Sequence, residues 1–108
     1  MLEHCQNEKD VENTYRNGFL RFLSEATITS PHRTDGVLRT DTLFVLLEFK
    51  HDYDFGRRGE RCEVLMQCVV YLRRFYEQGD QIPTSIFVGD INECFAMPSE
   101  QLLPYRAG

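Results

Sequence analysis

The sequence lacks the features that would place it in a membrane, outside the cell, or on nucleic acid through bulk charge. Its longest uninterrupted apolar run, 43–47, is far too short to cross a bilayer. The polar start MLEHCQNEKD does not resemble a secretory signal peptide. Net positive charge is also missing, because 12 lysines and arginines stand against 17 aspartates and glutamates. We therefore expect a cytoplasmic protein with no membrane partner, whose contacts with any nucleic acid are local.

The cysteines lack the spacing of a metal or redox site. Neither a CxxC pair nor a cysteine with a suitably spaced histidine occurs among Cys5, Cys62, Cys68 and Cys94. No zinc site and no redox pair is therefore predicted. Cys62 and Cys68 lie among apolar residues of an expected helix, and we interpret both as buried, reduced thiols.

A chain of 108 residues, 42% hydrophobic and 27% charged, predicts one folded domain. An amphipathic helix is expected over 8–25, and the Thr, Ser and Pro content of 27–33 indicates a loop. The helix is predicted because apolar side chains recur there at spacings of three and four: Val11, Tyr15, Phe19, Phe22 and Leu23.

The apolar run 43–47 predicts a central strand that is covered on both faces of a sheet. Residues 37–38 can pair with it in antiparallel orientation, because the polar connection 39–42 has the length of a hairpin turn. The two strands should therefore lie side by side.

A second helix is expected over 60–78, followed by a strand over 82–88 and a last short strand over 93–97. Because a helix separates 43–47 from 82–88, these two strands should be parallel and joined by a right-handed crossover. The fold class is therefore α/β, a central mixed sheet flanked by helices in the order α-β-β-β-α-β. The buried stripe of the second helix is expected to consist of Leu65, Val69, Leu72 and Tyr76.

Charged side chains follow the central strand directly. Glu48 and Lys50 share one face of the extended chain, while Phe49 points to the other. A surface Glu–Lys pair is one interpretation, and the turn-forming dipeptide Asp35-Gly36 is by itself only a turn signal. The hairpin, however, can bring Asp35 beside Glu48. Two carboxylates and the carbonyl of Phe49 would then form an oxygen pocket suited to Mg²⁺. Asp41 is a weaker alternative acid, because the hairpin turn would direct it away.

These residues resemble the core of the PD-(D/E)xK nuclease superfamily. Asp35 is followed by Glu48-Phe49-Lys50 at the end of an apolar strand, although Thr34 replaces the proline of the motif name. Two further motifs are similar to the RecB-like and restriction-endonuclease branches. Gln67 and Tyr71 form QxxxY on the second helix, and Glu12 with Arg16 forms ExxxR on the first. Both motifs also have an ordinary explanation. Tyr71 of QxxxY could simply pack in the core, and Glu12 and Arg16 could form an exposed ion pair.

The resemblance implies a restriction-endonuclease-like fold and a metal-dependent deoxyribonuclease. Asp35, Glu48 and the Phe49 carbonyl would hold Mg²⁺, with Mn²⁺ as a substitute, and Lys50 would position the attacking water. Glu12, Gln67 and Tyr71 would complete the catalytic site. The implied products are 3′-hydroxyl and 5′-phosphate ends.

The expected substrate is DNA, contacted through Arg57, Arg58 and Arg61 next to the active-site strand. The resemblance also implies that residues 1–108 form a single nuclease domain, which could be the N-terminal part of a larger restriction or repair enzyme with methyltransferase or helicase parts. A homodimer is a second expectation, drawn from the apolar content of 91–105. The alternative function is a catalytically inactive domain of the same fold that binds protein or nucleic acid.

Overall fold

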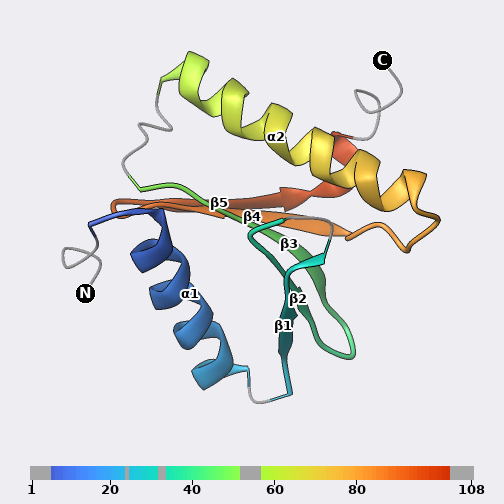
Figure 1. Cartoon of the computed structure of the whole chain (residues 1–108), viewed down its shortest axis with the longest axis horizontal. Coiled ribbons are helices and arrows are strands. Elements are labelled where there is room, and N and C mark those ends of the chain that lie inside the picture. The colour runs from blue at the N-terminus through green and yellow to red at the C-terminus, as the bar shows by residue number, and fades with distance from the viewer. Residues whose placement is uncertain (1–5, 24, 32–33, 52–56, 103–108) are drawn as a thin grey trace.

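The computed structural model describes residues 6–23, 25–31, 34–51 and 57–102 of the chain. A five-stranded sheet lies between two helices, α1 (Glu8–Phe22) and α2 (Arg58–Glu77) (Figure 1). No helix within the described ranges is long and apolar enough to span a bilayer. The α/β class and the mixed sheet flanked by helices are thus confirmed. The strands, in spatial order, are β1 (Thr27–Thr29), β2 (Gly36–Arg39), β3 (Phe44–Phe49), β4 (Ser85–Gly89) and β5 (Cys94–Pro98).

The strand pairing follows the predicted connections. The β2–β3 hairpin is antiparallel and runs from the pair Arg39–Phe44 to the pair Gly36–Leu47. α2 then carries the chain back over the sheet, so that β4 pairs with β3 in parallel orientation. β5 turns back antiparallel on β4, and a short 3-10 helix, Ser99–Gln101, follows it. The hairpin and the parallel crossover are both confirmed.

β1 lies in the segment 27–33, for which a loop was predicted. Its residues Thr, Ile and Thr pair antiparallel with β2, with Ile28 opposite Leu38. The prediction treated the threonines as polar loop residues, whereas β-branched side chains favour extended backbone. Positions 32 and 33 of this segment lie outside the described residues.

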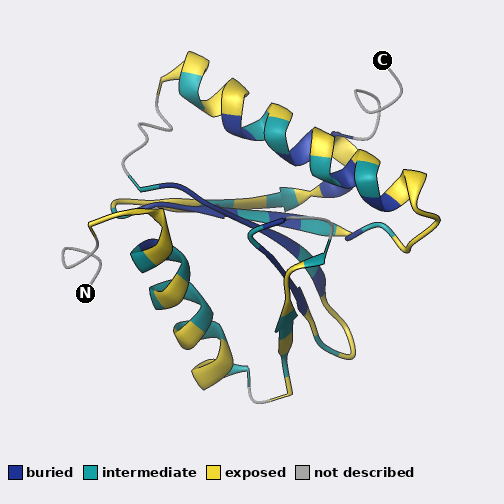
Figure 2. Ribbon diagram, in the orientation of Figure 1, coloured by how far each residue is buried: buried dark blue, intermediate teal, exposed yellow. Residues whose placement is uncertain are grey.

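β3 is the centre of the fold because its side chains alternate between two cores. Leu46 packs under α2, and Leu47 and Phe49 pack under α1. All three are at most 1% exposed. Figure 2 shows the buried central strands between two helices whose outer sides are exposed. The prediction of a strand covered on both faces is therefore confirmed.

Several apolar residues lie elsewhere than predicted. Phe22 and Tyr76 are 79% and 61% exposed, and Cys62 is exposed while Cys68 is buried. Six residues of helix correspond to a rotation of about 600°, so Cys62 and Cys68 cannot face the same core. The buried stripe of α2 is instead centred on Cys68 and includes Val64, Val69, Leu72 and Phe75.

The apolar residues after β4 belong largely to the two cores. Leu102 is buried against the α2 side, and Phe95 and Met97 pack against the same cluster. Ile91 packs on the α1 side. Part of the apolar character of 91–105 is therefore used in packing within the chain, and the homodimer stays a prediction. Positions 103–105 lie outside the described residues.

Tyr15, in the middle of α1, fixes this helix to the sheet. Its ring stacks on Phe49 at 5.5 Å and meets Phe87 edge-on at 5.3 Å between centroids. Its hydroxyl donates to the carbonyl of Asp90 at 3.0 Å. Gly89 makes this approach possible, because a Cβ there would lie 2.8 Å from the Tyr15 ring. The middle of α1 therefore lies against the carboxyl ends of β3 and β4.

Candidate active site

Asp35 and Glu48 meet where β2 begins and β3 ends. The last pair of the hairpin ladder is Gly36–Leu47, so the next residues outward, Asp35 and Glu48, lie opposite each other. Residues opposite each other in an antiparallel pair direct their side chains to the same face. The Asp35 carboxylate lies close enough to Glu48 to raise the pKa of this side chain. The prediction that these two acids lie close together is therefore confirmed.

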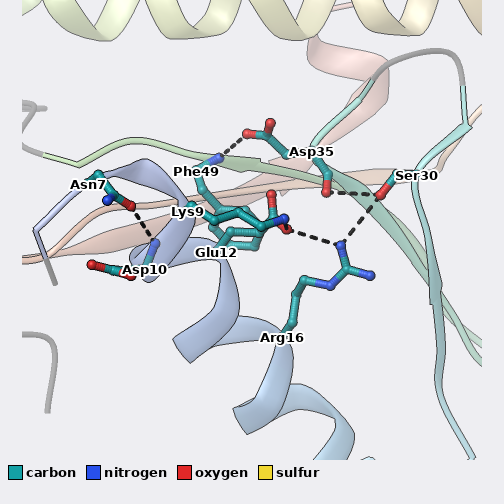
Figure 3. Close-up of polar contacts among 8 residues, drawn as sticks. All are labelled: Asn7, Lys9, Asp10, Glu12, Arg16, Ser30, Asp35 and Phe49. Carbon is teal, nitrogen blue, oxygen red and sulfur yellow. Dashed lines mark hydrogen bonds and ion pairs between the residues drawn. The ribbon is translucent and has the colours of Figure 1, made fainter.

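Asp35 is oriented by the backbone of β3. Its Oδ2 accepts a hydrogen bond from the Phe49 N–H at 2.8 Å (Figure 3). In an extended strand the N–H and C=O of one residue point to the same side. The Phe49 carbonyl is therefore directed to the edge of β3 on which Asp35 lies, which is the position that the oxygen pocket requires.

Lys50 lies between two acids. Its Nζ is 3.7 Å from Glu48 Oε1 and 3.9 Å from Oε1 of Glu8, the first residue of α1. The Lys50 side chain is only 8% exposed, and that of Glu48 only 3%. An ammonium group is thus held at the acid pair by burial, as the shared strand face of Glu48 and Lys50 predicted.

Burial dominates the electrostatics of Glu48 and raises its pKa from 4.5 to about 9. The negative charge of Asp35 and the hydrogen bond between the two carboxyl groups raise this pKa further, Lys50 lowers it, and Glu8 adds a smaller increase. At neutral pH Glu48 is therefore protonated. Two like charges this close require a shared positive charge, and here a proton provides it.

The Asp35 and Glu48 carboxyl groups and the Phe49 carbonyl suit a divalent cation that takes its remaining ligands from water. Oε2 of Glu48 is buried and has no hydrogen-bond partner among the described residues, although a buried carboxylate oxygen without a partner is costly. No group of three or more His, Cys, Asp or Glu in that part of the chain is arranged to hold a metal. Mg²⁺ needs only one or two carboxylates because it retains several waters. Two carboxyl groups and one carbonyl therefore suit Mg²⁺ better than zinc.

α2 covers the acid pair from above. Glu48 and Asp35 both raise the pKa of the Tyr71 hydroxyl, after burial as the largest cause. Burial and then Glu48 likewise raise the pKa of the Cys68 thiol. One turn before Tyr71, Oε1 of Gln67 is buried without a hydrogen-bond partner in the described ranges. The QxxxY residues thus lie on the part of α2 that faces the acids.

Glu12 forms two ion pairs, and its side chain is only 12% exposed. It accepts from Lys9 at 3.0 Å and from Arg16 at 3.2 Å. The Arg16 guanidinium also donates to Ser30 Oγ at 3.5 Å, and Ser30 donates to the Asp35 carbonyl at 3.4 Å (Figure 3). Glu12 is therefore linked to the backbone at Asp35. The α1 acid that acts on Glu48 is Glu8, one turn earlier.

The three arginines predicted to contact substrate lie at the start of α2, and all are exposed. Arg57 and Arg61 are one turn apart, and the same side of the helix carries Val64 and Cys68 further along. Because Cys68 faces the acid pair, Arg61 occupies a sheet-side position of the helix, whereas Arg57 is its extended N-cap residue. Arg58 is directed about a quarter turn away.

Sequence reasoning missed two charged residues at the site. Glu8 was treated only as an acidic helix start, yet it lies 3.9 Å from Lys50. The Arg74 guanidinium lies 5.1 Å from the centroid of the Tyr71 ring and lowers the pKa of its hydroxyl. The spacing of Tyr71 and Arg74 could have indicated their contact, whereas the approach of Glu8 depends on how α1 packs. Asp41 is exposed in the β2–β3 turn, at the far end of the hairpin from Glu48.

Comparison of the chain with protein-family models, with curated proteins and with solved structures finds no match. The geometry of the acid pair, Lys50 and the α2 residues above them is therefore the basis for any functional conclusion.

Proposed function

We propose that this chain is a Mg²⁺-dependent nuclease with a restriction-endonuclease-like fold, which hydrolyses DNA phosphodiester bonds in a restriction or repair system. One observation carries the proposal. A buried carboxyl group, Glu48, is paired with Asp35, has Lys50 within 3.7 Å and keeps one oxygen without a hydrogen-bond partner among the described residues. A buried charge cluster of this kind is expensive for a domain with a purely structural role.

The acids and the strand backbone have the role of ligands. Asp35, Glu48 and the Phe49 carbonyl would hold Mg²⁺ or Mn²⁺, and the proton between the two carboxyl groups would leave when the ion binds. When bound, the ion supplies positive charge that stabilises the transition state of phosphodiester hydrolysis. The hydrogen bond from the Phe49 N–H keeps Asp35 in place before and after the exchange.

Lys50 has the role of positioning the attacking water. Its ammonium group carries three donors and no acceptor, and its burial restricts it to the neighbourhood of Glu48. Tyr71 and Gln67 approach from α2. The buried Gln67 Oε1, without a hydrogen-bond partner in the described part of the chain, can accept from a water or a substrate group there.

DNA is the proposed substrate, and its phosphates would be contacted by Arg57 and Arg61. A chain of net charge −5 needs such a local cationic patch to approach a polyanion. These exposed arginines lie on the α2 face that leads to Cys68 and the acid pair. They therefore favour a phosphate backbone that runs along the start of α2 toward Lys50.

Cleavage of supercoiled plasmid DNA with and without Mg²⁺ tests the proposal. We expect Glu48→Gln and Lys50→Ala to reduce the cleavage rate at least about 100-fold while circular dichroism stays unchanged. Asp41→Asn is the matched control, because it removes an exposed acid from the other end of the same hairpin. This control should cut like the parent chain.

Titration calorimetry with Mn²⁺ separates ion binding from chemistry. Glu48→Gln should lose Mn²⁺ binding, and Lys50→Ala should keep it. Cleavage that persists in both variants would reject the site. Mn²⁺ binding without cleavage of any DNA tested would reject the enzyme and favour the inactive binding domain.

A further inference from the structure

The side of α2 that faces away from the sheet is exposed (Figure 2), and a set of its residues recurs at regular spacing. Its members are separated alternately by four and three residues, which is the heptad spacing along which two helices pack lengthwise. We call this set the α2 seam: Gly59, Glu63, Met66, Val70, Arg73 and Glu77. All six residues are exposed.

The middle of the α2 seam is apolar. Met66 is 54% and Val70 is 45% exposed, and both are among the large hydrophobic side chains that the fold leaves in solvent. The opposite side of the same helix is already used, because Val64 and Cys68 are buried against the sheet. About half of each side chain in the exposed pair at the centre of the seam therefore remains in solvent.

The charges around this centre are complementary to a second α2 in only one direction. In an antiparallel pair with its two-fold axis at residue 68, Met66 lies opposite Val70, and Glu63 lies opposite Arg73. In a parallel pair Glu63 would lie opposite Glu63, and Arg73 opposite Arg73, which is repulsive. Arg73 is 3.7 Å from Glu77 in its own helix, so its guanidinium can bridge Glu77 and Glu63 of the partner subunit.

We propose that the α2 seam is a self-association surface, on which a second copy of this chain packs its own α2 in antiparallel orientation. One helix pair buries less than the roughly 800 Å² per partner of a standard stable interface, so the dimer is a weak one that forms at micromolar concentrations. The proposal is independent of catalysis, since the seam lies on the side of α2 opposite Cys68.

Sedimentation velocity of the full chain without DNA or metal, from about 10 µM to about 1 mM, measures the association. We expect a reversible monomer–dimer equilibrium. Val70→Lys should raise the dissociation constant about tenfold or more, because it places a charge at the apolar centre twice per dimer. Tyr76→Lys is the matched control: it changes a more exposed side chain on the same helix, outside the seam. This control should dimerise like the parent chain.

Charge reversal tests the orientation. Glu63→Arg and Arg73→Glu should each weaken the dimer, and the double reversal in one chain should restore it, because only antiparallel packing places these two positions opposite each other. Circular dichroism should show the same helix content for all variants. A chain that stays monomeric throughout the concentration range would overturn the proposal. A dimer that is indifferent to Val70→Lys, or a double reversal without restoration, would do the same.

Discussion

The protonation of Glu48 gives a quantitative prediction for folding stability. In the folded chain its pKa is about 9, against 4.5 for an ordinary glutamate. Between these two values the folded state holds one proton more than the unfolded state, so the free energy of unfolding falls as pH rises. The slope is about 1.4 kcal/mol per pH unit. Over the 2.5 units from pH 4.5 to pH 7 the loss reaches at most about 3 kcal/mol.

Glu48→Gln removes this proton linkage and keeps the shape and a donor of the protonated carboxyl group. We expect the variant to match the parent chain near pH 5 and to exceed it by at most about 3 kcal/mol at pH 7. The stability difference should continue to increase up to about pH 9. The same substitution removes the proposed metal ligand, so the protein becomes more stable as it loses its function.

Urea unfolding followed by circular dichroism, at pH values from about 5 to about 8.5 in the presence of EDTA, measures both free energies. Asp41→Asn serves again as the control, because it removes an exposed carboxylate at the far end of the hairpin from Glu48. Added Mg²⁺ should stabilise the parent chain increasingly with pH and leave Glu48→Gln unaffected. The difference in unfolding free energy between Glu48→Gln and the parent chain could instead be independent of pH over this range. Glu48 would then be ionised in the folded chain, and the argument for a shared proton would be refuted.

Two further predictions concern packing. Gly89→Ala should destabilise the fold by about 1–3 kcal/mol in urea unfolding, because the added Cβ would lie 2.8 Å from the Tyr15 ring. Gly89→Ala should cost less stability in a chain that also carries Tyr15→Leu, because the ring is then absent. An equal loss with and without the ring would show that the ring does not clash with the added Cβ. The Cys68 thiol is buried and its pKa is raised, so it should react with a thiol reagent only as fast as the chain opens, whereas the exposed Cys62 should react at once. Equal rates for Cys62→Ser and Cys68→Ser chains would contradict this assignment.

The parts of the fold that the sequence predicts well are those in which one local pattern has a single explanation. An apolar run that continues over 43–47 can only be covered on both faces, and a helix between two strands makes them parallel. The Asp35–Glu48 pairing followed from the hairpin alone. In each case the chain itself brings the residues together.

The sequence is less informative where several faces compete. α2 carries apolar residues around much of its circumference, so Tyr76 was assigned to the core although Phe75 occupies that place. The homodimer prediction rested on the apolar residues after β4, and the sequence did not indicate that Met66 and Val70 on α2 are exposed. The contact between Glu8 and Lys50 could not be predicted, because it depends on the angle at which α1 crosses the sheet.

The alternation of β3 couples correct folding to chemistry. Phe49 belongs to the α1 core. Its neighbour Glu48 belongs to the acid pair on the other face, and Lys50 lies beside Glu48. A slip of the hairpin by one residue would push both charges into the α1 core and turn the phenyl ring toward Asp35. A chain with a shifted register would therefore lose the α1 core and the acid pair together. A length change in the turn at 40–43 that shifts the register should have this effect.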